Sequence, residues 1–497
     1  MNGVTIGEEP LRVEDLLAVV QRAPVEVGPG ARSRIEASHA VVDEVLATGT
    51  PIYGLNTGVG HMKDTLLSEE QMRAQQEMLL MTHAGGLGPP LPTDVVRAAI
   101  MVRLNGIARG GSGASLEAAE TLAAMLNAGV HPIASTIGSV GAGDLPQMAS
   151  IALVVIGAGR AELDGDVLSG EEALKRAGIT PLRLGPKDGL ALMSANGISI
   201  GQAALVVGRA ELVAGAVDVA AALSLEAKAG NPAITLSAVG RAKPYPGQVE
   251  AIKSLRDALA DSYLFEAGAP HSIQDPLSFR VAPQVHGAFR EIVSFTRRSV
   301  EIELNSSSDN PLVLVEDQTM VHNGNFHPVV LALACDSLRV AIAHVGQLSE
   351  RRMSHLWDTF FENLAHAEVS PSAQGMPEFF GISLRYPAAA VLAELKQLAA
   401  PATLDCPPLD IGTEDHATSA PLSVSKAGSA LEQLEDLIVV ELLMAHDALA
   451  TTPRAPRLGS STGEVLRKVK GVLAAPMADR SPHEVHRALR SSYLAGA

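Results

Sequence analysis

The segment that most constrains the fold runs from Gly201 to Lys228, where alanine, valine and leucine follow one another without a proline. Isolated polar residues, among them Arg209, Glu211 and Asp218, interrupt it. A segment that is apolar on most sides indicates a helix buried over most of its surface. At 1.5 Å per residue this helix would be about 40 Å long. We therefore expect other long helices to pack around it.

Four further segments show the three- and four-residue spacing of apolar positions that is typical of helices. They are residues 283–304, 329–353, 388–397 and 422–449. Aromatic residues make up only 3% of the chain and hydrophobic residues 47%. The core must then consist mainly of alanine, leucine, valine and isoleucine, which suits closely packed helices better than sheets. We predict a mainly α protein built on a long-helix bundle.

The chain divides by composition into three parts. Residues 1–190 contain clusters of Gly and Pro, which predict shorter helices joined by functional loops. Residues 191–480 are expected to form the bundle, and residues 481–497 a C-terminal tail. One small β-hairpin is predicted between residues 310–316 and 320–323.

Charge and cysteine content argue against several classes of function. Asp and Glu number 55 against 38 Lys and Arg, a net charge of -17, which disfavours nucleic acid or an anionic membrane as the main partner. Two cysteines, Cys335 and Cys406, cannot form a disulfide framework, and no Cys/His spacing resembles a zinc site. No secretory signal and no membrane span is expected. We expect a cytoplasmic protein.

Residues 53–60 read Tyr-Gly-Leu-Asn-Thr-Gly-Val-Gly. A glycine-rich loop can hold a phosphate, but this one lacks the lysine and the spacing of a P-loop. A mobile loop that presents Tyr53 as an acid or base fits better. An ordinary turn is the alternative.

Residues 138–145 read GSVGAGDL and lead into an apolar helix predicted from about Pro146 to Gly157. Asp144 suits the N-cap, and Pro146 suits the first turn because its missing N–H is harmless there. Free amides at such a helix start would favour an anion or a developing negative charge. A capped helix without further function is the alternative.

Other polar groups in loops are candidates for substrate contacts. Arg280 is the kind of residue that pairs with a carboxylate through two hydrogen bonds. Glu414 and His416 place a carboxylate next to a histidine just before a long helix. Each could instead belong to a solvated helix start. His483 and His486 lack the spacing of a zinc protease helix, so no metal is expected.

Together these motifs resemble the aromatic amino acid ammonia-lyase family, and within it the histidine ammonia-lyases most. The resemblance is collinear from residue 50 to about 450 and rests on residues 53–60, 82–84, 138–145, 189–192, 274–280, 283–287, 303–311, 324–327, 348–352 and 414–416. It implies the long-helix bundle of the fumarase/aspartase-like type. It also implies a homotetramer whose active sites are shared between subunits.

The resemblance implies roles for individual residues. Tyr53 corresponds to the base that removes the β-proton, and Arg280 to the residue that holds the α-carboxylate of an amino-acid-like substrate. His83 and Glu414 match positions associated with the substrate's side chain or amino group, and Glu414 is also a candidate catalytic residue. The other residues expected to bind substrate are Asn196, Gln274, Asn310 and Phe326.

One departure from the family concerns its electrophile, a methylidene-imidazolone formed from an Ala-Ser-Gly triad within GSVGASGDL. Here the serine between Ala142 and Gly143 is missing. The middle residue must lose water from its side chain, and no residue of the degenerate triad Gly141-Ala142-Gly143 carries a hydroxyl. Ser139 lies outside the register, and Val140 would crowd the cyclising amide. We predict that this prosthetic group is absent and expect no other cofactor.

Two smaller departures affect the substrate pocket. Leu277 stands where the family usually has a tyrosine, and the family's LxNGT string appears as residues 192–197 with Asn196 displaced. Both changes are expected to reshape the pocket.

The sequence leaves three functions open. The first is a lyase that retains the tyrosine base and the arginine clamp but acts on a substrate with a better leaving group or a more acidic proton. The second is histidine deamination to urocanate and ammonia with an unusual electrophile, which requires the loss of two water molecules from the chain. The third is a catalytically silent homologue that binds a small amino acid or assembles with an active relative.

Overall fold

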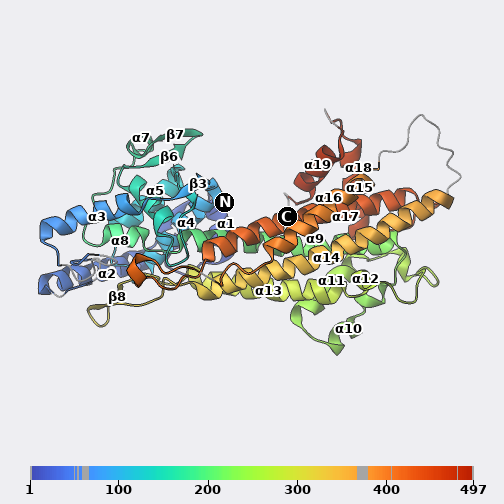
Figure 1. The fold of residues 1–497 in the computed structure, drawn as a ribbon, viewed down its shortest axis with the longest axis horizontal. Helices are drawn as coiled ribbons and strands as arrows, with labels where there is room; N and C mark the ends of the chain where they lie inside the picture. Colours follow the sequence, from blue (N-terminus) through green and yellow to red (C-terminus); the bar gives the residue numbers. More distant parts are fainter. Residues whose placement is uncertain are drawn as a thin grey trace. The chain divides into compact units, whose positions relative to one another are not determined.

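The mainly α class is confirmed by the computed structural model, in which most elements are helices and the strands are only two to four residues long (Figure 1). The structure describes residues 3–49, 51–52, 55–58, 66–366, 379–404, 406–477 and 480–494.

The chain forms two compact units. Unit 1 comprises Met1–Gly208, Thr296–Cys335 and Pro401–Ser425, and unit 2 comprises Arg209–Phe295, Asp336–Ala400 and Lys426–Ala497. Four long helices contribute residues to both units: α9 (Gly197–Ala227), α13 (Ala282–Leu304), α14 (Val329–His366) and α17 (Ala420–Ala450). The division predicted from the sequence, with boundaries at residues 190 and 480, is into continuous segments. The two units are discontinuous in sequence and do not test it, so this division stays a prediction.

Besides its portions of the long helices, unit 1 contains shorter helices joined by loops. Its helices are α1 (Val13–Val20), α2 (Pro29–Thr48), α3 (Glu69–His83), α4 (Thr93–Ala108), α5 (Leu116–Ala128), α6 (Leu145–Val155), α7 (Gly170–Arg176), α8 (Asp188–Met193) and η4 (Asp410–Gly412). Its strands are β1 (Val4–Ile6), β2 (Val25–Val27), β3 (Leu87–Pro90), β4 (His131–Pro132), β5 (Ser135–Ile137), β6 (Arg160–Leu163), β7 (Asp166–Ser169), β8 (Leu312–Leu314) and β9 (Thr319–Val321). They form four small sheets with the orders β1-β2, β3-β5, β4-β6-β7 and β8-β9, of which only β1-β2 is parallel.

Unit 2 packs short helices against its portions of the long ones. These helices are η2 (Pro232–Thr235), α10 (Ser237–Ala242), α11 (Pro246–Ala258), η3 (Tyr263–Phe265), α12 (Leu277–Arg280), α15 (Phe380–Ser383), α16 (Arg385–Leu398), α18 (Ser460–Ala474) and α19 (Pro482–Leu494). A cluster of small and apolar side chains from α9, α11 and α12 fills one part of its core, with Phe279 as its largest member.

The long helices confirm the periodicity of the sequence. α9, α13 and α17 begin and end within four residues of the predicted segments, whereas α14 continues to His366. The predicted hairpin is present as the antiparallel pair β8-β9. The segment described from the sequence as a tail contains α19, whose Val485 and Leu489 are fully buried.

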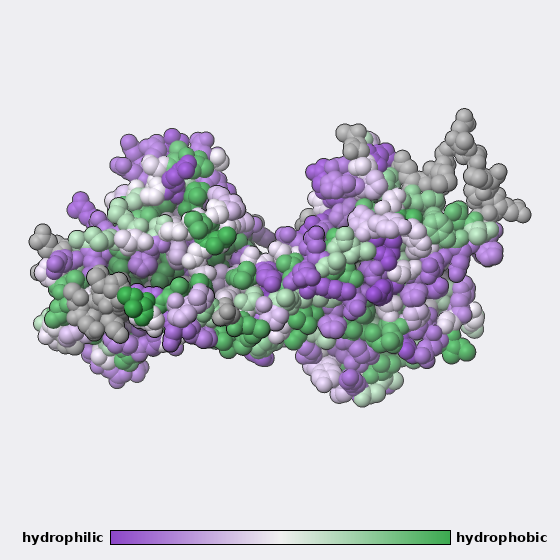
Figure 2. Space-filling view, viewed as in Figure 1, coloured by the Kyte–Doolittle hydropathy of each residue, from purple (hydrophilic) through white to green (hydrophobic). Residues whose placement is uncertain are grey.

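Two helical segments, Asp188–Ala227 and Val329–His366, are long and apolar enough to span a membrane by length and composition. The most apolar stretch of the first is 89% buried inside the protein and that of the second 50%. The first therefore has the burial of a core helix, as its sequence predicts. On the face drawn in Figure 2, hydrophobic residues reach the surface in several places among hydrophilic ones.

A buried ion pair joins three long helices within unit 2. Glu441 on α17 receives two hydrogen bonds from the Arg352 guanidinium on α14, at 2.6 and 2.9 Å. The hydroxyls of Ser224 and Ser349 donate to the same carboxylate at 2.7 and 2.6 Å. Four donors thus replace the water that this fully buried carboxylate gives up.

The same arginine positions α12. Its Nη1 donates to the carbonyl oxygen of Ser278 at 3.2 Å. Ser278 lies two residues before Arg280, so the buried pair fixes the backbone of the short helix that carries this arginine.

Substituting Arg352→Met should lower the free energy of unfolding by about 3–5 kcal/mol, because it leaves the Glu441 carboxylate buried without its charged partner. Urea denaturation followed by circular dichroism measures the change. Lys253→Ala, which removes an exposed pair with Asp257, is the control and should leave the midpoint unchanged. An Arg352→Met protein as stable as the parent would show that the pair does not hold the helices.

Candidate active site

A cavity of about 490 Å³ opens in unit 1. It brings together several predicted site residues: His83, Asn310, Phe326, Glu414, and Ala142 and Gly143 of the degenerate triad. The other residues that line it are Gly138, Ser139, Val140, Leu145, Pro146, Leu190, Met193, Ser194, Leu409 and Asp410.

His83 is the last residue of α3, a helix that begins with a capping box between Ser68 and Gln71. Its Nδ1 lies 2.8 Å from the carbonyl oxygen of Leu79. A carbonyl only accepts, so Nδ1 carries the hydrogen of the neutral ring, and Nε2 keeps its lone pair. Neutral His83 therefore offers a hydrogen-bond acceptor to a ligand.

The loop 138–145 is a tight turn closed by one hydroxyl. Ser139 Oγ accepts a hydrogen bond from the Gly141 N–H and donates to the carbonyl oxygen of Gly143, both at 2.9 Å. Gly141 and Gly143 have φ values of +87° and +80°. The carbonyl of Gly141 accepts from Thr418 Oγ1 at 2.7 Å, and a Cβ at Gly141 would lie 2.2 Å from that oxygen. Position 141 thus requires glycine.

Two buried side chains, those of Asn196 and Asp144, fix the position of the loop through hydrogen bonds. Asn196 is fully buried, and its side chain accepts from the Gly143 N–H at 3.1 Å and donates to the Phe326 carbonyl at 2.9 Å. Asp144 occupies the N-cap position of α6 as predicted, but its side chain makes no capping hydrogen bond. It accepts instead from the N–H and hydroxyl of Ser199, and burial raises its pKa.

Asn196 does not line the cavity, so its predicted contact with the substrate stays a prediction. Its observed bonds connect the loop to the segment that carries Phe326. We expect it to act on the substrate through these two neighbours.

The residues of this loop do not fit the methylidene-imidazolone. None of residues 141–143 carries a hydroxyl to be lost. The Ser139 hydroxyl is engaged as both donor and acceptor in closing the turn, and the next residue, Val140, is tied through its carbonyl to the Ser419 N–H at 2.8 Å.

A six-residue turn places two carboxylates on the cavity wall. The N–H of Leu409 donates to the Glu414 carbonyl at 2.7 Å, and the Glu414 N–H donates to the Leu409 carbonyl at 3.2 Å. Between them, Ile411 has a φ of +56°, an uncommon conformation for a β-branched residue that is typical of functional sites. Sequence reasoning missed Asp410, although two acidic residues four positions apart around a glycine were a usable signal.

The cavity is electrostatically negative. Asp410 and Glu414 are its carboxylates, and within the described part of the chain no lysine or arginine lines it. Such a wall favours a ligand with a positive charge at the end that faces these groups.

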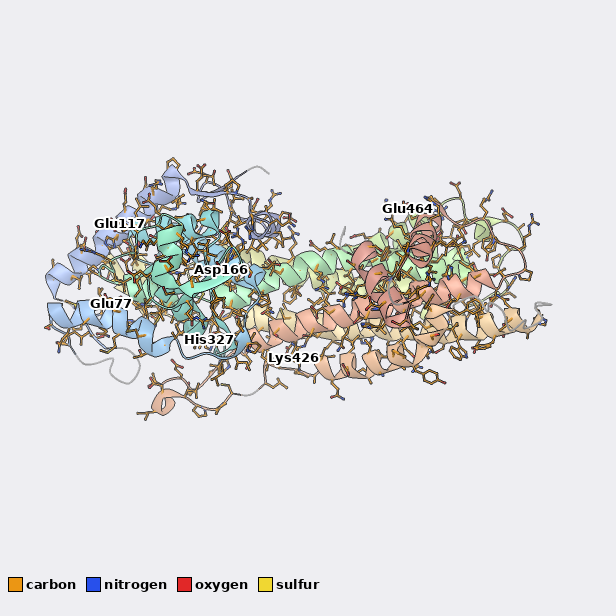
Figure 3. All side chains as sticks on the ribbon, turned by 90° about the horizontal axis from the view of Figure 1, so that it is seen from above. Glu77, Glu117, Asp166, His327, Lys426 and Glu464 are labelled. Carbon is orange, nitrogen blue, oxygen red and sulfur yellow. The ribbon has the colours of Figure 1, made fainter. Side chains whose placement is uncertain are left out.

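A contact between His327 and His416 joins the segment that carries Phe326 to the segment that carries Glu414. Nε2 of His327, labelled in Figure 3, lies 3.0 Å from Nδ1 of His416, two residues beyond Glu414. Burial and the neighbouring His416 lower the pKa of His327. Among the described residues, no group of three or more His, Cys, Asp or Glu side chains could hold a metal ion.

Gln274 and Arg280 belong to unit 2 and do not line the cavity. Arg280 is half-buried and Gln274 is exposed. Their neighbours Ile273 and Leu277 are 96% and 59% exposed. Tyr53, the predicted base, lies outside the described residues.

A family model described as aromatic amino acid lyase matches residues 11–471. The chain belongs to the aromatic amino acid lyase family. Histidine ammonia-lyase from Gloeobacter violaceus is 38% identical over 462 residues, which cover 92% of this chain and 90% of the relative. The enzyme of that name from Myxococcus xanthus is 37% identical over 494 residues, or 97% and 94% of the two chains. This family's members are carbon–nitrogen lyases, and the chain is accordingly a lyase-family enzyme.

Solved structures of the family superpose along the whole chain. The ergothioneine-degrading enzyme ergothionase from Treponema denticola, solved with desmethyl-ergothioneine sulfonic acid, has a TM-score of 0.91 and 27% identity, covering 100% of this chain and 99% of its own. Histidine ammonia-lyase from Trypanosoma cruzi has a TM-score of 0.85 and 28% identity, covering 99% and 94%.

A buried lysine that was not anticipated from the sequence binds the backbone next to the cavity wall. Lys187 is fully buried, and its Nζ donates to the carbonyls of Ser112 and Pro311, the latter at 2.8 Å. Pro311 directly follows Asn310 in the cavity wall. Burial lowers the pKa of Lys187 to about 8.

This shift predicts a pH dependence of stability. Between pH 8 and the ordinary lysine value of 10.5, the unfolded chain holds a proton that the folded chain has released, so the free energy of unfolding rises with pH. From pH 7.5 to 9.5 the gain due to Lys187 should be about 2 kcal/mol.

Urea denaturation of the parent and of Lys187→Met at both pH values isolates this contribution, since other titrating groups are common to both proteins. Lys470→Met, at an exposed position, is the control and should keep the parent's pH dependence. Equal pH dependence in the parent and Lys187→Met would contradict the assignment.

Proposed function

We propose that this enzyme eliminates a tertiary amine from an amino-acid-like substrate that carries a quaternary ammonium group and an imidazole-type ring, without a methylidene-imidazolone. The observation that carries the proposal is the loop 138–145, whose residues do not fit that electrophile although His83, Asn310, Phe326 and Glu414 line the same cavity.

The leaving group decides which reaction remains accessible. An α-amino group departs poorly, and general-base catalysis alone contributes only about 10²–10⁴-fold. A trimethylammonium group needs no activation because it leaves as a neutral amine. Tyr53 takes the β-hydrogen as a proton, the C–H electron pair forms the Cα–Cβ double bond, and the C–N pair leaves with the nitrogen.

The cavity and the comparisons support a substrate of this class. Ergothioneine, named in the description of the T. denticola enzyme, is the trimethylammonium betaine of an amino acid with a 2-thioimidazole ring. The relatives named histidine ammonia-lyase favour an imidazole-type ring. The carboxylates of Asp410 and Glu414 favour a cation, and the ring of Phe326 can stabilise one as well.

The α-carboxylate needs a cationic partner from outside the described lining of the cavity. We propose that a second copy of this chain, in a homotetramer, supplies Arg280 and Gln274. The exposed Ile273 and Leu277 beside them support this, since apolar side chains so exposed favour coverage by a partner.

Histidine deamination is the second candidate because relatives of that name are 34–38% identical to this chain. It would require an electrophile formed through Ser139 or a rearranged loop. A silent homologue is the third, and it would bind such compounds without turnover.

The identity of the released amine distinguishes the three candidate functions. Incubation with ergothioneine, with its desulfurised analogue histidine trimethylbetaine, and with histidine should give trimethylamine from one or both betaines and only trace ammonia from histidine. Tyr53→Phe should lower the rate by about 10²–10⁴-fold. Rapid formation of urocanate and ammonia from histidine would contradict the proposal.

Shared active sites predict complementation between inactive variants. Tyr53→Phe and Arg280→Ala should each be nearly inactive, whereas a mixed assembly obtained by coexpression should regain part of the activity. Coexpression of Tyr53→Phe with a Tyr53→Phe, Arg280→Ala double variant is the control. Activity that stays lost in the first mixture would place Tyr53 and Arg280 of one copy in the same site.

A further inference from the structure

Two histidines beside the cavity share one hydrogen bond. Nε2 of His327 lies 3.0 Å from Nδ1 of His416, with the ring centroids 5.2 Å apart. Such a bond needs a hydrogen on one nitrogen and a lone pair on the other. Nδ1 of His327 is buried and has no hydrogen-bond partner among the described residues. Because a buried N–H without an acceptor is rarer than a buried acceptor without a donor, Nε2 of His327 carries the hydrogen and donates it to His416.

The segment that carries His327 is fixed by other hydrogen bonds. The His327 N–H donates to the Gly324 carbonyl at 3.0 Å, and Asn196 donates to the Phe326 carbonyl at 2.9 Å. The His327 ring packs edge-on against the Phe326 ring, with the centroids 5.5 Å apart. His327 therefore presents its Nε2 hydrogen from a fixed position next to a cavity residue.

The segment that carries His416 depends more on this bond. We call residues 409–416 the Glu414 turn. Two backbone hydrogen bonds close the turn upon itself, and its last six residues are all exposed in the single chain. Since few buried contacts hold an exposed turn, packing does little to fix its position. The bond to His327 attaches the turn beside Phe326.

We propose that the hydrogen bond between His327 and His416 holds the Glu414 turn against the segment that carries Phe326, and that it breaks when both rings are protonated. With one added proton, a lone pair remains between the two nitrogens and the bond survives. A second proton puts hydrogens on both nitrogens and places two positive charges across a 3.0 Å contact. His416 is then a positioning residue that acts on a ligand through the carboxylates of the turn. The bond is a property of the fold and does not rest on the identity of the substrate.

The second proton binds below the ordinary histidine value. Burial lowers the pKa of His327 most, and the charge of His416 lowers it further, whereas a hydrogen bond with the His416 backbone acts in the opposite direction. Opening of the turn takes up this proton, so the closed turn is fully favoured above pH 6.5 and weakens as the pH falls below that value.

Other titratable groups on the surrounding elements are common to the parent protein and to the variants below. Their own titration therefore cancels when these proteins are compared. They are Asp410, Glu414 and Asp415 in the turn, His322 and the Asp309–Arg103 ion pair near the His327 segment, His83 at the end of α3, and Asp144 next to the loop 138–145.

Hydrogen–deuterium exchange followed by mass spectrometry measures the opening of the turn directly. The protein is labelled at pH 7.5, 6.5 and 5.5, and the rates are corrected for the intrinsic pH dependence of amide exchange. In the parent, peptides that cover the Glu414 turn should lose protection about fivefold from pH 6.5 to pH 5.5, because opening takes up one proton. Peptides from α9 report on the fold as a whole and should stay protected.

Two substitutions at one position separate the hydrogen bond from its titration. His416→Asn places an amide oxygen where Nδ1 accepts, so the bond survives protonation of His327 and the turn should stay protected at all three pH values. His416→Leu removes the acceptor and should expose the turn at all three. His483→Asn, at an exposed histidine of α19, is the control and should keep the pH dependence of the parent.

Equal protection of the turn in His416→Leu and the parent overturns the inference, and so does a pH dependence that persists in His416→Asn. If peptides from α9 also lose protection in His416→Leu, the comparison of the parent with His416→Asn decides alone.

Binding of ergothioneine to the Tyr53→Phe protein adds a readout that rests on the proposed function. Its affinity should fall less towards pH 5.5 when His416→Asn is added. The expected exchange pattern without any binding of the betaine supports the inference while the proposed function fails. Binding of the betaine combined with exchange of the turn that does not change with pH overturns the inference alone.

Discussion

The hydroxyl of Ser139 closes the loop at residues 138–145 by bonding to the Gly141 N–H and the Gly143 carbonyl. Thr418 holds the same loop through the Gly141 carbonyl and leaves no room for a side chain there. The loop is therefore held in one conformation, and it contributes Ser139, Val140 and Ala142 to the wall of the cavity along with Gly138, Gly143 and Leu145. None of residues 141–143 has a hydroxyl from which to make an electron sink, and the proposed function therefore takes its reactivity from the substrate's leaving group.

The surrounding fold keeps this wall and the other cavity residues in place through buried polar groups. Asn196 ties the loop to the Phe326 segment, and Lys187 ties the segment after Asn310 to the Ser112 carbonyl. In unit 2, the Arg352–Glu441 pair fixes the helix that carries Arg280. Each of these groups is satisfied by several partners, which is the condition under which burial of polar groups specifies one arrangement.

The sequence predicted the long helices well because their apolar residues recur over many turns, as α9, α13 and α17 show. It predicted which motifs would gather around the cavity only through the family resemblance, since His83, Asn310 and Glu414 are far apart along the chain. The sequence could not predict that the Asp144 side chain would accept hydrogen bonds from Ser199 instead of capping α6, because this choice depends on tertiary contacts. The hydrogen-bonding state of His83 likewise follows from a bond to the Leu79 carbonyl that forms only in the folded chain.

The most direct measurement on the central claim is the intact mass of the purified protein, with a near-ultraviolet difference spectrum as a companion. If the loop cannot generate the electrophile, the mass equals that of the translated sequence and the spectrum shows only the aromatic side chains. A mass lower by two water molecules, with an added near-ultraviolet absorption, would contradict the account and restore ammonia elimination from histidine as the leading function.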